Sequence, residues 1–409
     1  MASRDKLTAA AAGACVALVA ARWLRRRAPY DGTQDEVRAI VRPNIRKLEP
    51  YRCARDDYEE GVLLDANENA YGACVKPSGS TPTSTLVKAA LTFDLHRYPC
   101  PHQKRVKDRV AAFRGVQRDN VFVGVGSDEA IDLLFRVFCE PRTANVVVTP
   151  ATYGMYKVCA ATQDVEVRTA ELLPESFAVD VEAVENACDA NTRLVFLCSP
   201  GNPTARQISR EVVERLLGSA KLRRSIIVVD EAYVDFAPEA TTAPLVAKYP
   251  RLVVLHTLSK AFGLAGIRCG TAIGSPQTVH FMNAVKAPYS INKMTSSLAA
   301  EALSAPSLAA LKAVVQDTLA ERGRLAEKLR ALPYVCTVFR SDANFLLVRL
   351  KDHAKAKPLY TKLAESGVVI RYRGDQANLS GCVRVTVGTP ADSYALLALL
   401  AKVAPGFGL

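Results

Sequence analysis

The feature that most constrains this 409-residue chain is a series of short, continuously apolar runs that begins near residue 120. The runs are rich in β-branched residues and cover 120–125, 145–149, 193–198, 225–229 and 251–256. Amphipathic helical patterns lie between several of them; one covers 129–138 and places its apolar side chains on one face. Strands that are apolar on both faces and alternate with helices indicate a mainly parallel sheet covered by helices. The sequence therefore predicts an α/β fold.

A second, smaller unit is expected from about residue 308. A long helix is predicted over 311–329, and two further strands over 344–350 and 383–387, which is typical of a small α+β domain. The full division that we predict is a leader over 1–37, an N-terminal arm over 38–74, a large domain over 75–307 and a small C-terminal domain over 308–409.

The first thirty residues differ in composition from the rest. Residues 7–21 are uncharged and dominated by alanine, and a basic segment follows at 22–27. Fifteen residues are short for a bilayer span, whereas basic flanks with almost no acid suit an organelle transit segment or a marginal membrane anchor. A disordered extension is the alternative. Depending on the role of the leader, we expect the protein in the cytoplasm or in an organelle, a plastid or a mitochondrion. Any membrane contact is expected only through the leader.

Charge and cysteine content exclude several classes of protein. The net charge is +12, of which the first thirty residues carry +5. The remaining excess could steer anionic substrates or simply solvate the surface. The body lacks a dense basic run interleaved with aromatic residues, so nucleic-acid binding is not indicated. Eleven cysteines occur without a Cys-x-x-Cys pair, which favours reduced intracellular thiols over a disulfide framework or a zinc site.

Polar residues directly follow several of the predicted strands, where ligands bind in open α/β sheets. The segment 124–129, Gly-Val-Gly-Ser-Asp-Glu, lies between a strand and a helix start. Its glycines permit close backbone approach, and a helix N-terminus attracts anions, so the segment outlines a phosphate cradle. An ordinary helix cap would have the same residue types.

Asp230 follows the apolar run 226–229 directly. A carboxylate in such a desolvated place requires a cationic partner, and a protonated pyridine nitrogen is one. A loop carboxylate in water is the other interpretation. In the segment 199–204, Pro200 and Pro203 fix the loop and so hold Asn202 in one direction, although an ordinary rigid turn would have the same sequence.

Lys260 follows another buried strand and has hydroxyl groups before it and a cation after it. A desolvated lysine near a second cation loses its proton readily and becomes a nucleophile for an aldehyde. Thr257, Ser259 and Arg268 could together hold a phosphate, since arginine donates paired hydrogen bonds.

The order of these motifs resembles the fold-type-I aminotransferases, which depend on pyridoxal 5'-phosphate. The motifs that carry the resemblance lie at 126–129, 153–156, 202–204, 230–233 and 259–262. More narrowly, the chain resembles the histidinol-phosphate aminotransferase family through segments at 48–51, 64–69, 97–99 and 380–389. The resemblance runs from about Val41 to the C-terminus. It implies a large pyridoxal-phosphate domain with a smaller C-terminal domain, in a homodimer.

The resemblance also implies roles for individual residues. Lys260 would carry the cofactor and move the proton, Asp230 would pair with the ring nitrogen, and Tyr153 would stack on the ring. Tyr233 and Asn202 would contact the phenolic oxygen. The residues implied for the cofactor phosphate are Ser127, Asp128, Thr257, Ser259, Arg268 and, from the other subunit, Tyr98. The residues implied for the substrate phosphate are Tyr51, Arg371 and Arg384. One departure from the family pattern is Ala205, where glycine is usual.

The implied reaction converts L-histidinol phosphate and 2-oxoglutarate into imidazole-acetol phosphate and glutamate, a step of histidine biosynthesis. Three alternatives remain. A threonine-phosphate decarboxylase-like lyase shares the scaffold, and an aromatic amino acid aminotransferase shares the chemistry. A protein that only binds the cofactor is the third alternative, but it would have no need of Lys260.

Overall fold

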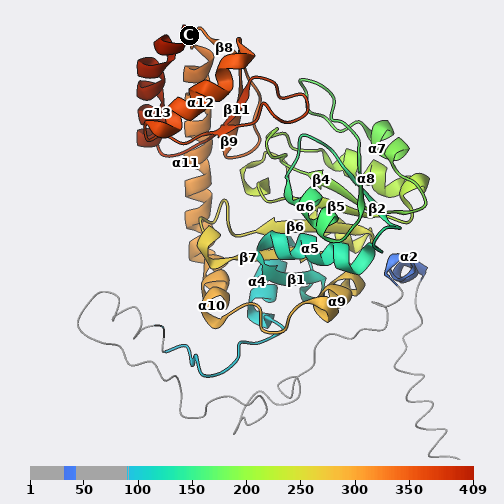
Figure 1. Ribbon diagram of the computed structural model, residues 1–409. Coiled ribbons are helices and arrows are strands. Elements are labelled where there is room, and N and C mark those ends of the chain that lie inside the picture. Colours follow the sequence, from blue (N-terminus) through green and yellow to red (C-terminus); the bar gives the residue numbers. More distant parts are fainter. Residues whose placement is uncertain (1–31, 43–89, 91) are drawn as a thin grey trace, which may run out of the picture.

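The computed structural model describes residues 32–42, 90 and 92–409, and this part of the chain contains two β-sheets in two units (Figure 1). The larger sheet has the strand order β1-β7-β6-β5-β4-β2-β3, and the smaller one β10-β11-β9-β8. The larger sheet consists of β1 (Val121–Val125), β2 (Asn145–Val148), β3 (Glu166–Thr169), β4 (Thr192–Cys198), β5 (Ile226–Asp230), β6 (Leu252–Thr257) and β7 (Cys269–Ile273). The smaller sheet consists of β8 (Val335–Val338), β9 (Phe345–Leu350), β10 (Arg371–Tyr372) and β11 (Cys382–Thr386).

The larger sheet is mainly parallel, as the apolar runs predict. β7 is antiparallel to both of its neighbours, β1 and β6, and every other pair in this sheet is parallel. All five predicted runs form strands. Almost all of their side chains are buried, which explains why these segments are apolar on both faces.

Helices cover both faces of this sheet, so alternate residues of a strand belong to different cores. Val121 and Val123 of β1 pack into one core, and Phe122 between them packs into the other. The helices of the first core are α4 (Lys104–Arg114), α7 (Val181–Ala187), α8 (Arg210–Gly218) and α10 (Lys293–Ala302). Those of the second are α2 (Gly32–Ile40), α5 (Gly126–Phe138), α6 (Met155–Thr162) and α9 (Pro276–Val285).

The smaller unit packs a separate apolar core between its sheet and three helices. These helices are α11 (Ala305–Arg330), α12 (Ala356–Glu365) and α13 (Pro390–Val403). α11 is the long helix that joins the two units in Figure 1. The predicted boundary at residue 308 falls inside α11, and the division into domains stays a prediction. Within the described ranges, no single helix is long and apolar enough to cross a membrane; α10 and α11 satisfy the length and composition criteria only together, with a 69° bend between them.

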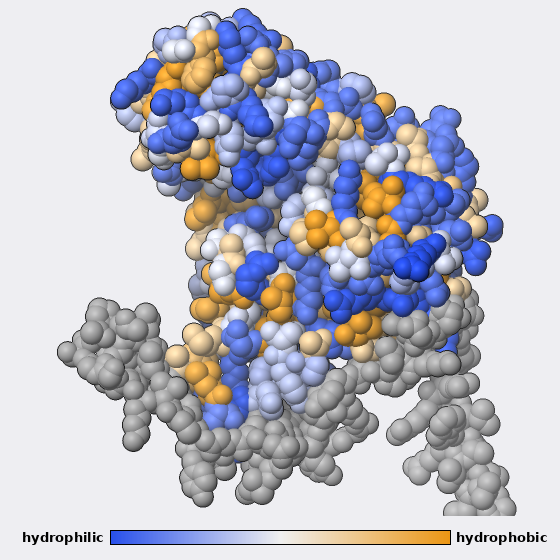
Figure 2. Space-filling model, in the orientation of Figure 1, coloured by the Kyte–Doolittle hydropathy of each residue, from blue (hydrophilic) through white to orange (hydrophobic). Residues whose placement is uncertain are grey.

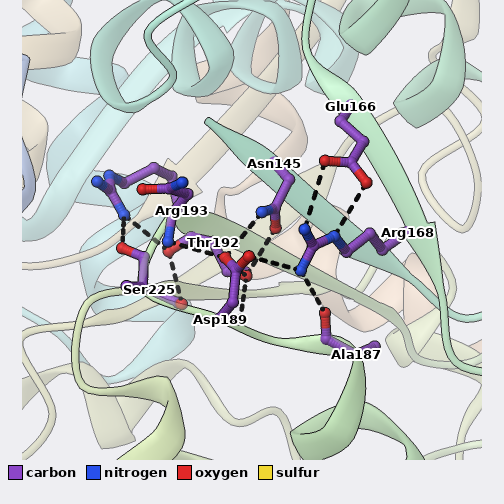
Figure 3. Close-up of polar contacts among 10 residues, drawn as sticks. Asn145, Glu166, Arg168, Ala187, Asp189, Thr192, Arg193 and Ser225 are labelled. Carbon is purple, nitrogen blue, oxygen red and sulfur yellow. Dashed lines mark hydrogen bonds and ion pairs between the residues drawn. The ribbon is translucent and has the colours of Figure 1, made fainter. Parts of the chain in front are cut away.

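A polar cluster fixes the amino-terminal edge of the larger sheet (Figure 3). Asn145 begins β2 and donates a 2.9 Å hydrogen bond to Asp189, which lies before β4. Thr192, the first residue of β4, donates to Asn145 at 2.6 Å, and Arg168 of β3 pairs with Asp189 at 2.8 Å. Three neighbouring strands are thereby tied together at the edge opposite the strand ends that the sequence singled out.

Candidate functional site

A cavity of about 320 Å³ lies at the carboxyl-terminal edge of the larger sheet, between it and the smaller unit. Asp230 is the last residue of β5 and Thr257 the last of β6, so both strands deliver side chains into it. The volume falls in the range of about 300–1,000 Å³ that is usual for small-molecule sites. Twelve of the residues singled out in the sequence line it: Ser127, Asp128, Tyr153, Asn202, Asp230, Tyr233, Thr257, Ser259, Lys260, Arg268, Arg371 and Arg384.

One candidate residue that the structure describes, Tyr98, does not line this cavity. Tyr98 is 48% exposed and lines a second cavity of about 370 Å³, which also contains Cys100 and Ser296. Its ring stacks on Tyr289 with 4.5 Å between the ring centroids. Tyr51 lies outside the described residues. The structure therefore brings together the candidates from the large and small units but does not place Tyr98 with them in one chain.

The first residue of α5, Gly126, requires glycine because its backbone is left-handed, and a guanidinium also lies against it. Gly126 has a φ of +74°, and a Cβ on it would lie 2.5 Å from Nη2 of Arg268. Gly270 is equally constrained, since its Cβ would lie 2.3 Å from the backbone nitrogen of Ser127. The first backbone N–H groups of α5 are thus held beside Arg268, and this end of a 13-residue helix favours an anion.

Side-chain hydroxyls surround the same point. The backbone N–H of Ser259 donates to Thr257 Oγ1 at 3.1 Å, and the two hydroxyls lie 2.9 Å apart. Arg268 Nη2 lies 3.4 Å from Asp128, which also accepts a 3.0 Å hydrogen bond from Tyr153. A helix N-terminus, two linked hydroxyls and a guanidinium form a suitable set of donors for a phosphate.

Asp230 is a buried carboxylate held by neutral donors. It is 3% exposed, accepts a 2.7 Å hydrogen bond from the hydroxyl of Tyr156 and accepts a 3.2 Å bond from the backbone N–H of Ala232. Burial raises the pKa of Asp230, whereas the two hydrogen bonds oppose that rise. A cation that entered the cavity beside this carboxylate would favour its ionised form and be stabilised in return.

Lys260 lies in the turn after β6 and reaches the same cavity. Its Nζ lies 5.6 Å from the centre of the Tyr233 ring. Desolvation and, after it, the charge of Arg384 lower the pKa of Lys260. The Lys260 amine is therefore more readily deprotonated than an ordinary surface lysine, which is what attack on an aldehyde requires.

The Asn202 loop keeps the amide at the cavity wall. The peptide bonds before Pro200 and Pro203 are both cis, and Asn202 Oδ1 accepts a 2.5 Å hydrogen bond from Arg384 Nη1. Ala205, which replaces the usual glycine, has a φ of +59° and is fully buried, so the chain keeps a left-handed conformation despite the methyl group. The departure noted in the sequence thus leaves the loop in place.

Arg371 and Arg384 reach the cavity from neighbouring strands of the small sheet. They are directly opposite each other in the antiparallel β10–β11 pair, and both side chains line the cavity. Like charges in this register repel. The arrangement suits a ligand with more than one negative charge.

Sequence reasoning missed four residues that line the cavity: Cys198, Ala232, Ala265 and Arg373. It also gave no role to Tyr156, which donates a hydrogen bond to Asp230 and does not itself line the cavity. Tyr156 belongs to a motif already recognised, but its place in an apolar helix indicates only a core residue. Arg373 stands two residues after Arg371, and strand alternation places both side chains on one face. The sequence does not predict a strand here, because β10 has only two residues.

Comparison with known proteins agrees with this geometry. The family model described as aminotransferase class I and II matches residues 59–400. The chain is similar to the histidinol-phosphate aminotransferase of Saccharomyces cerevisiae, with 43% identity over 384 residues that cover 88% of this chain and 96% of the yeast protein. It is 40% identical to the histidinol-phosphate aminotransferase of Parabacteroides distasonis, over 88% of this chain and 97% of that protein.

The fold also has solved counterparts. One is the crystal structure of histidinol-phosphate aminotransferase from Sinorhizobium meliloti in complex with pyridoxal-5'-phosphate. The TM-score is 0.70 and the identity 23%, over 94% of this chain and 97% of that chain. This likeness confirms the expected fold, with its large mainly parallel sheet and its smaller C-terminal unit.

Proposed function

Because the chain belongs to the class I and II aminotransferase family, we propose that it transfers an amino group from L-histidinol phosphate to 2-oxoglutarate, with pyridoxal 5'-phosphate as its cofactor. The products are imidazole-acetol phosphate and glutamate, and the reaction is a step of histidine biosynthesis. The observation that carries the proposal is a single cavity that joins Lys260 and Asp230 to a group of small-domain arginines. The names of the relatives at 40–43% identity support the choice of substrate.

The cavity fits the cofactor at two points. The α5 N-terminus with Thr257, Ser259 and Arg268 suits its phosphate, and Asp230 suits its ring nitrogen. The bound cofactor supplies an electron sink for the carbanion that forms at the amine-bearing carbon. Asp230 is buried and forms no ion pair with any residue that the structure describes, so a protonated ring nitrogen would provide the missing counter-charge.

The surrounding side chains then have distinct tasks. Lys260 holds the cofactor and, with its lowered pKa, accepts and returns the proton of the substrate carbon. Tyr153 packs over the ring, and Asn202 and Tyr233 orient its phenolic oxygen. Tyr156 is a positioning residue, because it contacts Asp230 and not the cavity.

The substrate end of the cavity is cationic. Arg371 and Arg384 would bind the phosphate of histidinol phosphate, with Tyr51 as an additional contact. In the other half-reaction Arg384 would bind a carboxylate of 2-oxoglutarate. Arginine suits both anions because its planar fork donates paired hydrogen bonds.

A homodimer would complete the site. Tyr98, which does not line the Lys260 cavity of its own chain, would then reach the cofactor phosphate of the partner. Apolar side chains are exposed nearby, including Leu95, Met294 at 42% and Leu298 at 48%. Figure 2 shows apolar surface around α10 at the lower left of the molecule, which fits a covered interface better than a free surface.

Residues 1–30 would act as an address and not as part of the enzyme. Residues 1–30 lie outside the segment 59–400 that matches the family. We expect a chain without them to keep its solubility, its cofactor absorbance and its turnover, and we expect the same residues to direct a fluorescent fusion partner to an organelle. Loss of soluble enzyme on truncation would instead mean that the segment packs on the body.

Product analysis tests the reaction itself. Purified enzyme is given histidinol phosphate labelled with ¹⁵N at its amine, together with 2-oxoglutarate. The label should appear in glutamate, and omission of 2-oxoglutarate should stop turnover after one equivalent per site. Release of carbon dioxide from threonine phosphate without a keto acid would instead assign the chain to the lyase alternative.

A further inference from the structure

We propose that Arg373 is a third phosphate-binding cation of the substrate pocket and sets its preference for a phosphorylated substrate over a carboxylate. The inference deepens the proposed function and rests on it for the identity of the substrate. It concerns a residue that none of the recognised motifs contains.

Strand geometry places Arg373 on the same face as the other two arginines. Its backbone N–H donates to the carbonyl of Cys382 at 2.9 Å, which extends the β10–β11 pairing one residue beyond Tyr372. Tyr372 and Val383, which are paired with each other, pack into the small-unit core. By alternation the neighbouring arginines must face the opposite way, and Arg371, Arg373 and Arg384 all line the cavity.

The arginine group has too few anionic partners within the described structure. The Nε atoms of Arg373 and Arg384 are both buried and have no hydrogen-bond partner there. Arg384 Nη1 donates to the neutral amide of Asn202. Asp375 is the acidic residue that acts on Arg373, and it is exposed.

The pKa shifts of these arginines also indicate that negative charge is lacking near them. Desolvation and, next, the charge of Arg371 lower the pKa of Arg373. Desolvation and, next, the charge of Arg373 lower that of Arg384. The protein therefore holds three mutually repelling cations in one wall of the cavity, a cost that a bound anion of suitable charge would remove.

A charge count selects the kind of anion. Arg268 already pairs with Asp128, and Lys260 lies within the field of Asp128 and Asp230. The three small-unit arginines are then left for the substrate. A phosphate monoester carries about 1.5 to 2 negative charges near pH 7 and has three terminal oxygens, whereas a carboxylate carries one charge on two oxygens. A carboxylate is satisfied by one guanidinium fork, but a phosphate can accept from three.

The test uses Arg373→Gln and Arg373→Lys in the holoenzyme, with Arg330→Gln as the control. Arg330 is an exposed arginine in the last turn of α11, outside the cavity, so its replacement removes the same charge from the small unit. Binding of inorganic phosphate is followed by titration of the cofactor absorbance, and the KM values for histidinol phosphate and 2-oxoglutarate are measured separately. The midpoint of thermal unfolding reports the folding of each variant.

Arg373→Gln should weaken phosphate binding and raise the KM for histidinol phosphate by about ten- to a hundred-fold, since it removes hydrogen bonds to a charged group. The KM for 2-oxoglutarate should change by less than about three-fold, because each of its two carboxylates needs only one guanidinium fork, and Arg371 and Arg384 both remain in the cavity. Arg373→Lys should be intermediate, since an ammonium acts as a point charge. Arg330→Gln should match the wild type.

Two results would overturn the inference. One is phosphate binding that is unchanged in Arg373→Gln; the other is an equal loss for phosphate and 2-oxoglutarate, which would mean a general field effect. If Arg373→Gln does not fold, the test is made on Arg373→Lys, by comparing its change in the KM for histidinol phosphate with its change in the KM for 2-oxoglutarate. Failure of the proposed function is distinguishable: wild-type enzyme would then not transaminate histidinol phosphate, while phosphate binding would still depend on Arg373.

Discussion

At the scale of single residues, the properties of the site come from burial. Asp230 and Tyr156 form a hydrogen-bonded pair in which both groups are almost completely buried, and the pKa of each is raised, first by desolvation. A carboxylate whose pKa is raised takes up its proton at a higher pH than an ordinary aspartate does. A cationic ring nitrogen beside Asp230 would reverse this tendency and keep the carboxylate ionised.

Asp230→Asn tests this pair. The amide preserves the shape of the side chain, so the variant should fold and still bind the cofactor. It cannot hold a ring nitrogen protonated, so turnover should fall by about a hundred-fold or more. Single-turnover kinetics of each half-reaction will measure the loss.

Tyr156→Phe is the matched variant. It removes one donor to Asp230 but leaves the carboxylate, so a loss of only about ten-fold is expected, in line with one hydrogen bond to a charged group. The cofactor absorbance of Tyr156→Phe should also respond to pH differently from that of the wild type. The result that would contradict the role of Asp230 comes from the first variant: turnover of Asp230→Asn close to that of the wild type would show that Asp230 is only structural.

How much of the site was visible in the sequence also depends on individual residues. Asp230 ends a strand, and Lys260 and the Gly126–Ser127 start of α5 follow strands closely, so their convergence follows from a mainly parallel sheet. Arg373 was not visible, because its face is fixed by a register with β11 that only the folded sheet defines. Tyr156 resembled an ordinary core residue, since a buried hydroxyl and a buried apolar group produce the same helical pattern.

At the scale of elements, the short apolar runs predicted β1, β2, β4, β5 and β6 because these strands are buried on both faces. β3, Glu-Val-Arg-Thr, is partly exposed at the sheet edge and carries charge, so nothing in its composition marks it. β7 begins directly after Arg268, which is left-handed. The glycine within β7 favours the prediction of a loop from the sequence. Tertiary pairing with β1 and β6 determines β7 instead.

The polar cluster at the amino-terminal edge should contribute to stability and not to catalysis. The hydrogen bond from Asn145, together with other donors and Arg168, lowers the pKa of Asp189 to about 2. Asp189→Ala leaves the buried Asn145 side chain without that acceptor. We expect a loss of about 1–3 kcal/mol, at the lower end because Asp189 is 40% exposed, with kcat unchanged.

The pH dependence of this effect has a definite sign. Because the pKa of folded Asp189 is below the ordinary value of 3.8, its contribution is complete only above about pH 5 and disappears as the pH falls towards 2. The difference in thermal midpoint between wild type and Asp189→Ala should therefore narrow between pH 5 and about pH 3. A difference that widens on acidification would contradict this assignment.

At the scale of the whole molecule, the placement of Tyr98 makes the dimer testable. Tyr98→Phe should weaken cofactor binding by about ten-fold, because it removes one hydrogen bond to a phosphate. Hybrid dimers that combine one Tyr98→Phe subunit with one Lys260→Ala subunit should regain wild-type affinity at the single site that retains Lys260. That site receives its tyrosine from the Lys260→Ala subunit. A hybrid that stays as weak as Tyr98→Phe would place Tyr98 in its own subunit's site.

The specificity of the reaction also belongs to the whole molecule, since the cavity draws Lys260 and Asp230 from the large unit and its arginines from the small one. The most direct test is to compare kcat/KM of the wild-type enzyme for histidinol phosphate, threonine phosphate and phenylalanine, with 2-oxoglutarate as the acceptor where one is needed. Histidinol phosphate should exceed both competitors by at least about a hundred-fold, because it alone combines a phosphate for the arginines with a side chain that this family of relatives accepts. A higher kcat/KM for threonine phosphate or phenylalanine would contradict the proposed substrate.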